Sequence, residues 1–300
     1  MVPHAETIID TPVEAHNGLK EKLKSDALWT SYGKDTSESV QSKVPTIPKF
    51  SDFASDRMYQ KQHAAAAFRY LSAQGYDEGL AGHISLRDPE HHDRFWINPL
   101  CKAFSTMKAS DLVLVSEKGE ILAGGNQVPI NPAGFMIHSA IHKARPDVNA
   151  AVHTHSVYGK AFSSLGIELD MITHDACNFF YQDHSVYPNF GGTVLDEEEA
   201  NNIANALGNN SAVILQNHGL VTVGHTVDEA TYLYGALDRC CHAQLLADAA
   251  ADGRGIKPKI VGHEEAKFCH EKLVSKDIRW MFFQPAYEEV LEKTGGAFLS

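Results

Sequence analysis

The chain has 300 residues, 43% of them hydrophobic and 21% charged, which is typical of a globular protein with one or two domains. A formal net charge of −12 without a clustered stripe of lysine and arginine argues against nucleic-acid binding. No apolar run approaches the ~20 residues that span a bilayer. The N-terminus has neither the basic start nor the apolar block of a secretory signal, so we expect an intracellular, cytoplasmic protein. The five cysteines are odd in number and contain no CxxC pair, which indicates reduced thiols instead of disulfides.

The first half of the chain predicts an arm followed by a mixed helical and extended domain. Residues 1–50 are polar and end in the proline-punctuated KVPTIPKF, so we expect a flexible N-terminal arm. The main domain is expected over 51–255, beginning with a helix that Ser55 caps and Gly75 ends. Two strands are expected in GHISLRDPEHHDRFWINPL. Another follows at DLVLVSEKGEIL, in which Lys118 and Gly119 are candidates for a hairpin turn.

The second half alternates helices with short β-rich runs. A helix that opens at Pro132 is followed by a strand over 148–152 and a helix over 156–166. A helix over 196–206 precedes two β-rich runs around QNHG, and Thr226 and Glu229 make a capping box for a long helix. Residues 256–300 are expected to form a helical or irregular extension. This order predicts a three-layer α/β/α fold around a largely antiparallel or mixed central sheet, and no GxGxxG or Walker loop supports a nucleotide fold.

Two histidine motifs are the strongest candidates for chemistry. In AVHTHS the residues His153 and His155 follow a buried strand, where positions i and i+2 point to the same face. His218 in QNHGLVTVG is expected in a hairpin turn that can aim it at the end of another strand. Three imidazoles with a vacant position make an open site for a catalytic divalent metal. The chain has 17 histidines, however, so an isolated HxH pair is also expected by chance.

The segments ARPDVNAAVHTHSVYGKAFSSLG and LQNHGLVTVGHTVDEA together resemble the class II aldolase/adducin family. The resemblance runs over about 53–250 and includes GYDEGLAGHISLRD, FWINPL and PNFGG. It implies a fuculose-phosphate aldolase-like lyase in which His153, His155 and His218 hold Zn²⁺, with Fe²⁺ or Mn²⁺ as alternatives. In the family the metal polarises a ketose carbonyl and stabilises an enediolate. The resemblance also implies that Tyr187 protonates the leaving aldehyde, and that the protein is a homotetramer with its active site at a subunit boundary.

The chain departs from the aldolase pattern at the acid/base position. By resemblance, Gly134 stands where the aldolases carry a glutamate, and a glycine cannot transfer a proton. Several hydroxyls that hold phosphate in the family are also missing, so the substrate is expected to be a small molecule but not necessarily a sugar phosphate. We expect His83, Ser85 and His184 to contact it, and His83 is also a candidate for the missing base. Arg87 is expected on the solvated surface.

Three functions follow from these observations. The first is a metal-dependent aldehyde-lyase that cleaves a C–C bond of a ketose phosphate or a related carbonyl or hydroxy-acid substrate. The second is an iron(II)-dependent oxygenase or decarboxylase on the same scaffold, because three histidines with open positions do not determine the metal. The third is a non-catalytic, adducin-like interaction module, which the three retained histidines disfavour.

Overall fold

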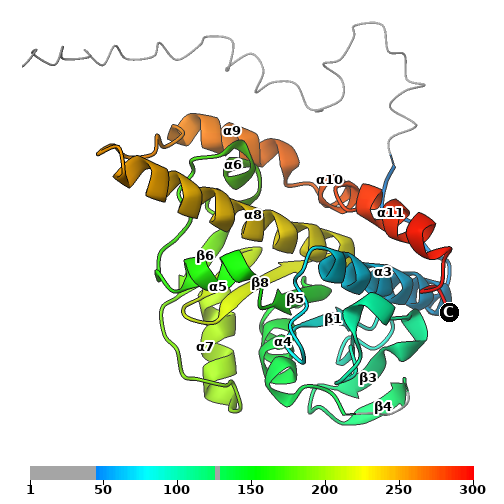
Figure 1. Cartoon of the computed structure of the whole chain (residues 1–300). Helices are drawn as coiled ribbons and strands as arrows, with labels where there is room; N and C mark the ends of the chain where they lie inside the picture. Colours follow the sequence, from blue (N-terminus) through cyan, green and yellow to red (C-terminus); the bar gives the residue numbers. More distant parts are fainter. Residues whose placement is uncertain (1–44, 126–128) are drawn as a thin grey trace, which may run out of the picture. The chain divides into compact units, whose positions relative to one another are not determined.

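A computed structural model of the protein describes residues 45–125 and 129–300 (Figure 1). The first 44 residues of the expected arm lie outside the described residues, and residues 45–50 are irregular and mostly exposed. The boundaries at residues 50 and 255 therefore stay predictions. The described residues contain one sheet with these strands: β1 (His83–Arg87), β2 (Arg94–Ile97), β3 (Val113–Ser116), β4 (Ile121–Gly124), β5 (Ala150–Thr154), β6 (His184–Tyr187), β7 (Ala212–Leu215) and β8 (Gly219–Gly224).

Helices cover both faces of this sheet. They are α3 (Phe53–Ala73), α4 (Pro132–Ala144), α5 (Val157–Ser163), α6 (His174–Phe180), α7 (Glu197–Leu207), α8 (Val227–Asp252), α9 (His263–Leu273), α10 (Lys276–Met281) and α11 (Gln284–Thr294). The pair α4 and α7 packs on one face, and α3, α5 and α8 pack on the other (Figure 1). The expected three-layer α/β/α architecture is confirmed.

The strand order is β4-β3-β2-β1-β5-β8-β7-β6, and only the edge pair β6 and β7 is parallel among the described strands. The expectation of a largely antiparallel or mixed sheet is therefore confirmed. At the centre of the sheet, β5 lies between β1 and β8, so that His83 pairs with His153 and His153 pairs with Val221. This arrangement brings together three segments that are far apart in the sequence.

The core between the sheet and the layer of α4 and α7 forms because every second side chain of a strand points to this face of the sheet. Ala151 on β5, Val213 on β7 and Val221 on β8 point toward Ile137 of α4 and Ile203 of α7. Residues at i+2 on a strand share a face, so His153 lies on the same side of the sheet as Ala151. The metal-ligand candidate is consequently directed toward the N-terminal end of α4.

Most expected elements are present, with two differences in detail. Helix α3 begins earlier than expected, because the carboxylate of Asp52 accepts a hydrogen bond from the Ser55 amide at 2.8 Å and acts as the cap in place of Ser55. Helix α8 is capped by Thr226 as expected, but the Glu229 carboxylate accepts from the amide of His225, one residue before the predicted partner. Helix α6 and strand β6 were not expected from the sequence.

The C-terminal segment forms three helices that pack against the rest of the described structure. Arg279 of α10 is 6% exposed and forms ion pairs with Asp183 at 2.8 Å and Glu229 at 3.3 Å. Its guanidinium thereby ties α10 to the start of β6 and the start of α8. Among the described residues, no helix combines the length and apolar character that crossing a membrane requires. The five cysteines are all free, as expected.

Candidate functional site

The three histidines predicted to bind a metal converge at one end of β5. His153 is on β5, His155 follows it by two residues, and His218 is in the turn between β7 and β8. This turn is tight because Asn217 adopts a left-handed conformation with φ of 59°, which asparagine tolerates better than most residues. One nitrogen from each of the three imidazoles lies within 4.8 Å of the other two.

The chemistry of these donors fits a divalent cation. His153 Nδ1 lies 2.8 Å from the carbonyl oxygen of Leu220 and donates to it, which leaves Nε2 with a free lone pair. A backbone carbonyl in this role is the usual way in which a ligating imidazole is oriented. Burial lowers the pKa of all three imidazoles, that of His218 to about 4, so they are neutral near pH 7. Neutral imidazole is the form that binds zinc or iron.

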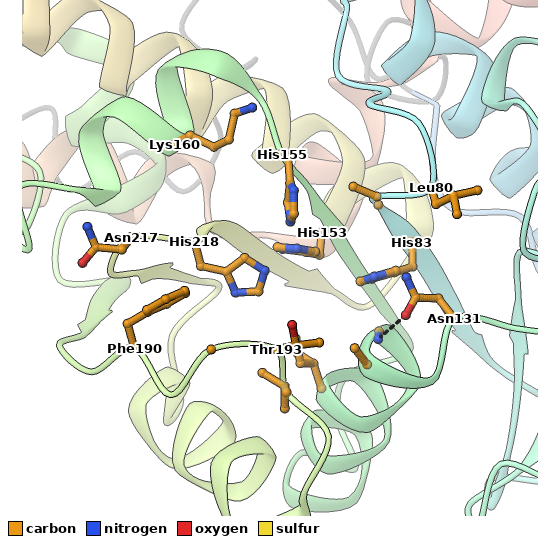
Figure 2. Close-up of a pocket in the computed structure, with 17 residues that line it drawn as sticks. Leu80, His83, Asn131, His153, His155, Lys160, Phe190, Thr193, Asn217 and His218 are labelled. Atoms are coloured by element: carbon orange, nitrogen blue, oxygen red, sulfur yellow. Dashed lines mark hydrogen bonds between the residues drawn. The ribbon is translucent and has the colours of Figure 1, made fainter.

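The histidines line a partly open cavity of about 500 Å³, whose lining residues are drawn in Figure 2. Its wall includes the N-terminal end of α4, the segment around Phe190 and the turn before β8. The lining residues are Leu80, Ala81, Gly82, His83, Asn131, Ala133, Gly134, Ile137, His153, His155, Lys160, Phe190, Gly192, Thr193, Val194, Asn217 and His218. A cavity of this size accommodates a small molecule beside the three imidazoles.

His83 lines this cavity and fills the space beside Gly134. Its ring is directed into the cavity in Figure 2 and stacks on His153, with ring centroids 5.1 Å apart. A Cβ atom at position 134 would lie 2.3 Å from Cδ2 and Nε2 of the His83 ring. The His83 imidazole and a side chain at position 134 therefore exclude each other, which accounts for the glycine at the position expected to carry a glutamate.

Two predicted substrate contacts, Ser85 and His184, do not line the cavity. Ser85 is completely buried under α4, two residues further along β1 than His83. His184 Nδ1 lies 2.7 Å from the carbonyl of Phe180, and its Nε2 accepts a hydrogen bond from the Leu169 amide, so both nitrogens are engaged with the backbone. These two side chains are not brought to the position of the expected substrate contacts.

Tyr187, the residue expected to donate a proton, points into the packing between β6 and α7. Its hydroxyl donates to Glu199 Oε2 at 2.7 Å, and the side chain is 5% exposed. Burial and the neighbouring carboxylate raise its pKa. Within the described chain, a direct contact between this hydroxyl and the cavity is absent.

The structure also adds side chains that sequence analysis missed. Lys160 at the cavity mouth forms an ion pair with Glu78 at 2.7 Å, and Asn131 and Thr193 contribute polar groups to the wall. The N-terminal end of α4 was recognisable from the sequence, but nothing indicated that its neighbour would be the loop around Thr193. Arg87, expected on the surface, is 7% exposed and donates to backbone carbonyls.

A comparison with protein families identifies a class II aldolase and adducin N-terminal domain over residues 62–245. The chain belongs to the class II aldolase/adducin family. Members of this family generally use a divalent metal ion, and the histidine triad of this chain lies within the matched residues. The recognition made from the two histidine motifs is thereby confirmed.

Similar proteins in the class II aldolase/adducin family have different names. The chain is 44% identical to "Decarboxylase NovR" of Streptomyces niveus over 82% of its own length and 89% of that protein. It is 43% identical to a "4-hydroxy-3-prenylphenylpyruvate oxygenase/4-hydroxy-3-prenylbenzoate synthase" of Streptomyces roseochromogenus subsp. oscitans over 82% and 87% of the two chains. Among solved structures, the L-fuculose 1-phosphate aldolase of Glaciozyma antarctica PI12 has a TM-score of 0.76 and 39% identity, covering 84% of this chain and 96% of that one.

Proposed function

We propose that the protein is a divalent-metal enzyme that cleaves a C–C bond next to a carbonyl group of a small molecule, with His153, His155 and His218 as metal ligands. The observation that carries this proposal is the convergence of the three imidazoles, within 4.8 Å of one another, at the wall of a 500 Å³ cavity. A divalent cation bound there supplies Lewis acidity at the oxygen atoms of a bound substrate.

The residues of the chain would orient the reactants and restrict water. The Leu220 carbonyl orients the His153 ring, and stacking against His83 limits its rotation. The apolar side chains of Leu80, Ile137 and Phe190 line the cavity and reduce the number of water molecules around a bound ligand. Asn131 has its side-chain oxygen occupied by the Gly134 amide at 3.1 Å, which leaves its amide nitrogen to donate to a ligand oxygen.

Among the possible reactions, we favour loss of CO₂ from a carbonyl or hydroxy acid. The electron pair of the broken C–C bond stays on the remaining carbon, where a proton takes it up or, in the oxygenase, O₂ does. Two relatives that match most of this chain carry the words decarboxylase and oxygenase in their names. In this chain Gly134 provides no carboxylate for the proton transfer that the aldolase reaction requires, and His83 occupies the space such a side chain would need. The reaction proposed here takes Fe²⁺ as the metal if oxygen is consumed, and Zn²⁺ or Mn²⁺ are the candidates if it is not.

A second candidate is aldehyde-lyase activity of the fuculose-phosphate aldolase type. It is supported by the solved aldolase from Glaciozyma antarctica, which is 39% identical and superposes with a TM-score of 0.76. In this case the proton donor would come from a group other than position 134. A cytoplasmic homotetramer with a neighbouring subunit at the cavity mouth stays a prediction, and such a neighbour is one possible source of the donor.

The decisive experiment combines metal analysis with turnover in air and under nitrogen. The full chain is purified without added metal, its metal content is measured, and it is assayed with an aromatic 2-oxo acid, an aromatic 2-hydroxy acid and a ketose 1-phosphate. Oxygen-dependent CO₂ release with bound iron indicates the oxygenase, and oxygen-independent CO₂ release indicates a simple decarboxylase. Release of an aldehyde from the ketose phosphate supports the lyase instead.

The matched control replaces a histidine away from the cavity. His155→Ala removes one proposed ligand, whereas His174→Ala removes an imidazole whose side chain is 77% exposed. We expect the first variant to lose metal and turnover and the second to retain both. Wild-type protein that binds no divalent metal at all would overturn the proposed function and favour a non-catalytic interaction module.

A further inference from the structure

A continuous row of polar side chains runs from the cavity into the interior between β1 and α4. His83 and Ser85 are two residues apart on β1, so their side chains lie on the same face of the sheet. His138 and His142 are one turn apart on α4. The two sets interlock: His83 Nδ1 lies 3.1 Å from His138 Nε2, and Ser85 Oγ lies 2.6 Å from His138 Nδ1 and 2.7 Å from His142 Nε2. All four side chains are at most 5% exposed.

At the inner end of this row, the surroundings of His142 determine which of its ring nitrogens donates a hydrogen bond and which accepts one. His142 Nδ1 lies 3.3 Å from the carbonyl oxygen of Val148, and a carbonyl can only accept a hydrogen bond. Arg87 Nη2 is also 3.4 Å from His142 Nδ1, but the two hydrogens of Nη2 have closer acceptors in the carbonyls of His142 at 2.7 Å and Arg145 at 3.2 Å. His142 therefore carries its proton on Nδ1 and donates it to Val148.

This single assignment fixes every other proton in the row. With Nδ1 protonated, His142 Nε2 is an acceptor, so the hydroxyl of Ser85 donates to it. The Ser85 oxygen then accepts from Nδ1 of His138, whose Nε2 is left as an acceptor. His83 consequently donates from Nδ1 to His138, and the remaining nitrogen of His83, Nε2, carries a lone pair.

The two inner histidines, His138 and His142, stay neutral over the pH range in which proteins are usually stable. Burial is the main cause that lowers the pKa of both His138 and His142 to about 3, and the positive charge of Arg87 acts in the same direction on His142. A neutral imidazole has one donor and one acceptor nitrogen. All hydrogen bonds of the row can therefore be donated in the same direction.

The outer end of the row opens into the cavity. His83 lines the cavity, and no group of the described residues forms a hydrogen bond with its Nε2. Figure 2 shows the ring of His83 beside that of His153, so a ligand that reaches the three proposed metal ligands also reaches His83.

We propose that the buried row His83, His138, Ser85 and His142 holds His83 as the Nδ1–H tautomer, so that Nε2 accepts a hydrogen bond from a hydroxyl group of the molecule in the cavity. Ser85, His138 and His142 are positioning residues, since they act on the ligand only through His83. The inference rests on the proposed function only for the kind of ligand. It favours substrates with a hydroxyl close to the carbonyl or carboxylate, such as 2-hydroxy acids, over substrates that offer only acceptors there.

Neutron diffraction tests the tautomer directly, because it locates deuterium atoms that X-rays do not show at ordinary resolution. The probe is the full chain loaded with Zn²⁺ and crystallised from D₂O. We expect deuterium on Nδ1 of His83, none on Nε2, and a cavity D₂O molecule that points a deuterium at Nε2. Deuterium on Nε2, or equal occupancy of the two nitrogens, would overturn the proposal.

Two variants separate positioning from packing. His142→Phe keeps a flat ring against Phe95 but removes the anchor at Val148, so both tautomers of His83 should appear. His142→Gln supplies an amide oxygen that can accept from Ser85 and should restore the single tautomer. A single Nδ1–H tautomer in His142→Phe would show that the row does not set it. The wild-type map decides the polarity even if the phenylalanine variant fails to fold, and neither result depends on whether C–C cleavage is observed.

Discussion

Replacing Gly134 with alanine tests whether the histidine at position 83 and the glycine at position 134 form a matched pair. Gly134 lies in the first turn of α4 and is helical, so an alanine fits the backbone. The new methyl group would lie 2.3 Å from two atoms of the His83 ring and 2.7 Å from a third. The ring cannot move away without cost, because His138 holds it by a hydrogen bond and His153 stacks on it.

The expected magnitude follows from two opposing effects. Overpacking of this kind costs about 1–3 kcal/mol, and loss of the bond between His83 and His138 costs roughly a further 1 kcal/mol. The higher helix propensity of alanine returns at most about 1 kcal/mol. A net loss of about 1–3 kcal/mol corresponds to a fall in Tm of roughly 2–10 °C for a chain of this size.

Thermal and urea unfolding of a double-mutant cycle measure the effect. In the His83→Ala background the clash is absent, so Gly134→Ala should be neutral or stabilising by up to about 1 kcal/mol. Gly253→Ala is the matched control, because its Cβ would meet only the Ala249 carbonyl at an ordinary 3.7 Å. Equal effects of Gly134→Ala with and without the His83 ring would refute the idea that the two positions exclude each other.

Four further predictions concern the metal site and the buried polar groups. His155→Ala should abolish metal binding and turnover, and unchanged metal content by elemental analysis would contradict the ligand assignment. Tyr187→Phe should reduce the free energy of unfolding by about 1 kcal/mol through loss of the bond to Glu199 and should leave metal content unchanged. If it instead lowers turnover about 100-fold without affecting stability, the hydroxyl reaches the substrate after all. Burial lowers the pKa of His142 from 6.5 to about 3, so the unfolded chain takes up this proton first, and stability is lost as pH falls below about 6.5. Urea titrations at pH 7 and 5 should show up to about 1.4 kcal/mol per pH unit from this residue, a contribution that His142→Phe removes. Arg279→Met should destabilise the chain by about 3–5 kcal/mol, because the buried carboxylate of Glu229 and the partly buried carboxylate of Asp183 both lose their ionic partner. A loss no larger than that of the same change at an exposed lysine would contradict this.

The strand and turn positions of the three histidines could be predicted because they depend on local rules, whereas the convergence of the three side chains followed from the family resemblance and depends on the pairing of β5 with β8. The two-residue repeat of a strand places His153 and His155 on one face, and turn chemistry places His218 between two strands. The Thr226 cap of α8 was recognisable for the same reason, since a cap involves residues only three positions apart. What these residues have in common is that their own neighbours in sequence determine their geometry.

The surroundings of the triad were not predictable, because they depend on contacts between distant segments. Nothing in the local sequence of α4 indicates that Gly134 makes room for a histidine 51 positions earlier on β1, although His138 and His142 at helical spacing were a signal of a buried polar row. The prediction of an exposed Arg87 was wrong, because a charged side chain can be buried when backbone carbonyls accept hydrogen bonds from its guanidinium. Strand β6 has the sequence HSVY, in which two of the four residues are polar, so it lacks the apolar run that marked the other four-residue strands.

The order of the strands has a consequence for how the protein folds. Strands β1 to β4 are neighbours in both sequence and space, so they can pair by closing short loops. Pairing of β5 with β1 and with β8, in contrast, closes two loops of about 70 residues each and carries a larger entropic penalty. We therefore expect the histidine triad to assemble late in folding, after strands β1 to β4 have paired with one another. An ion or ligand captured there should retard unfolding, with little effect on the rate at which the chain first folds.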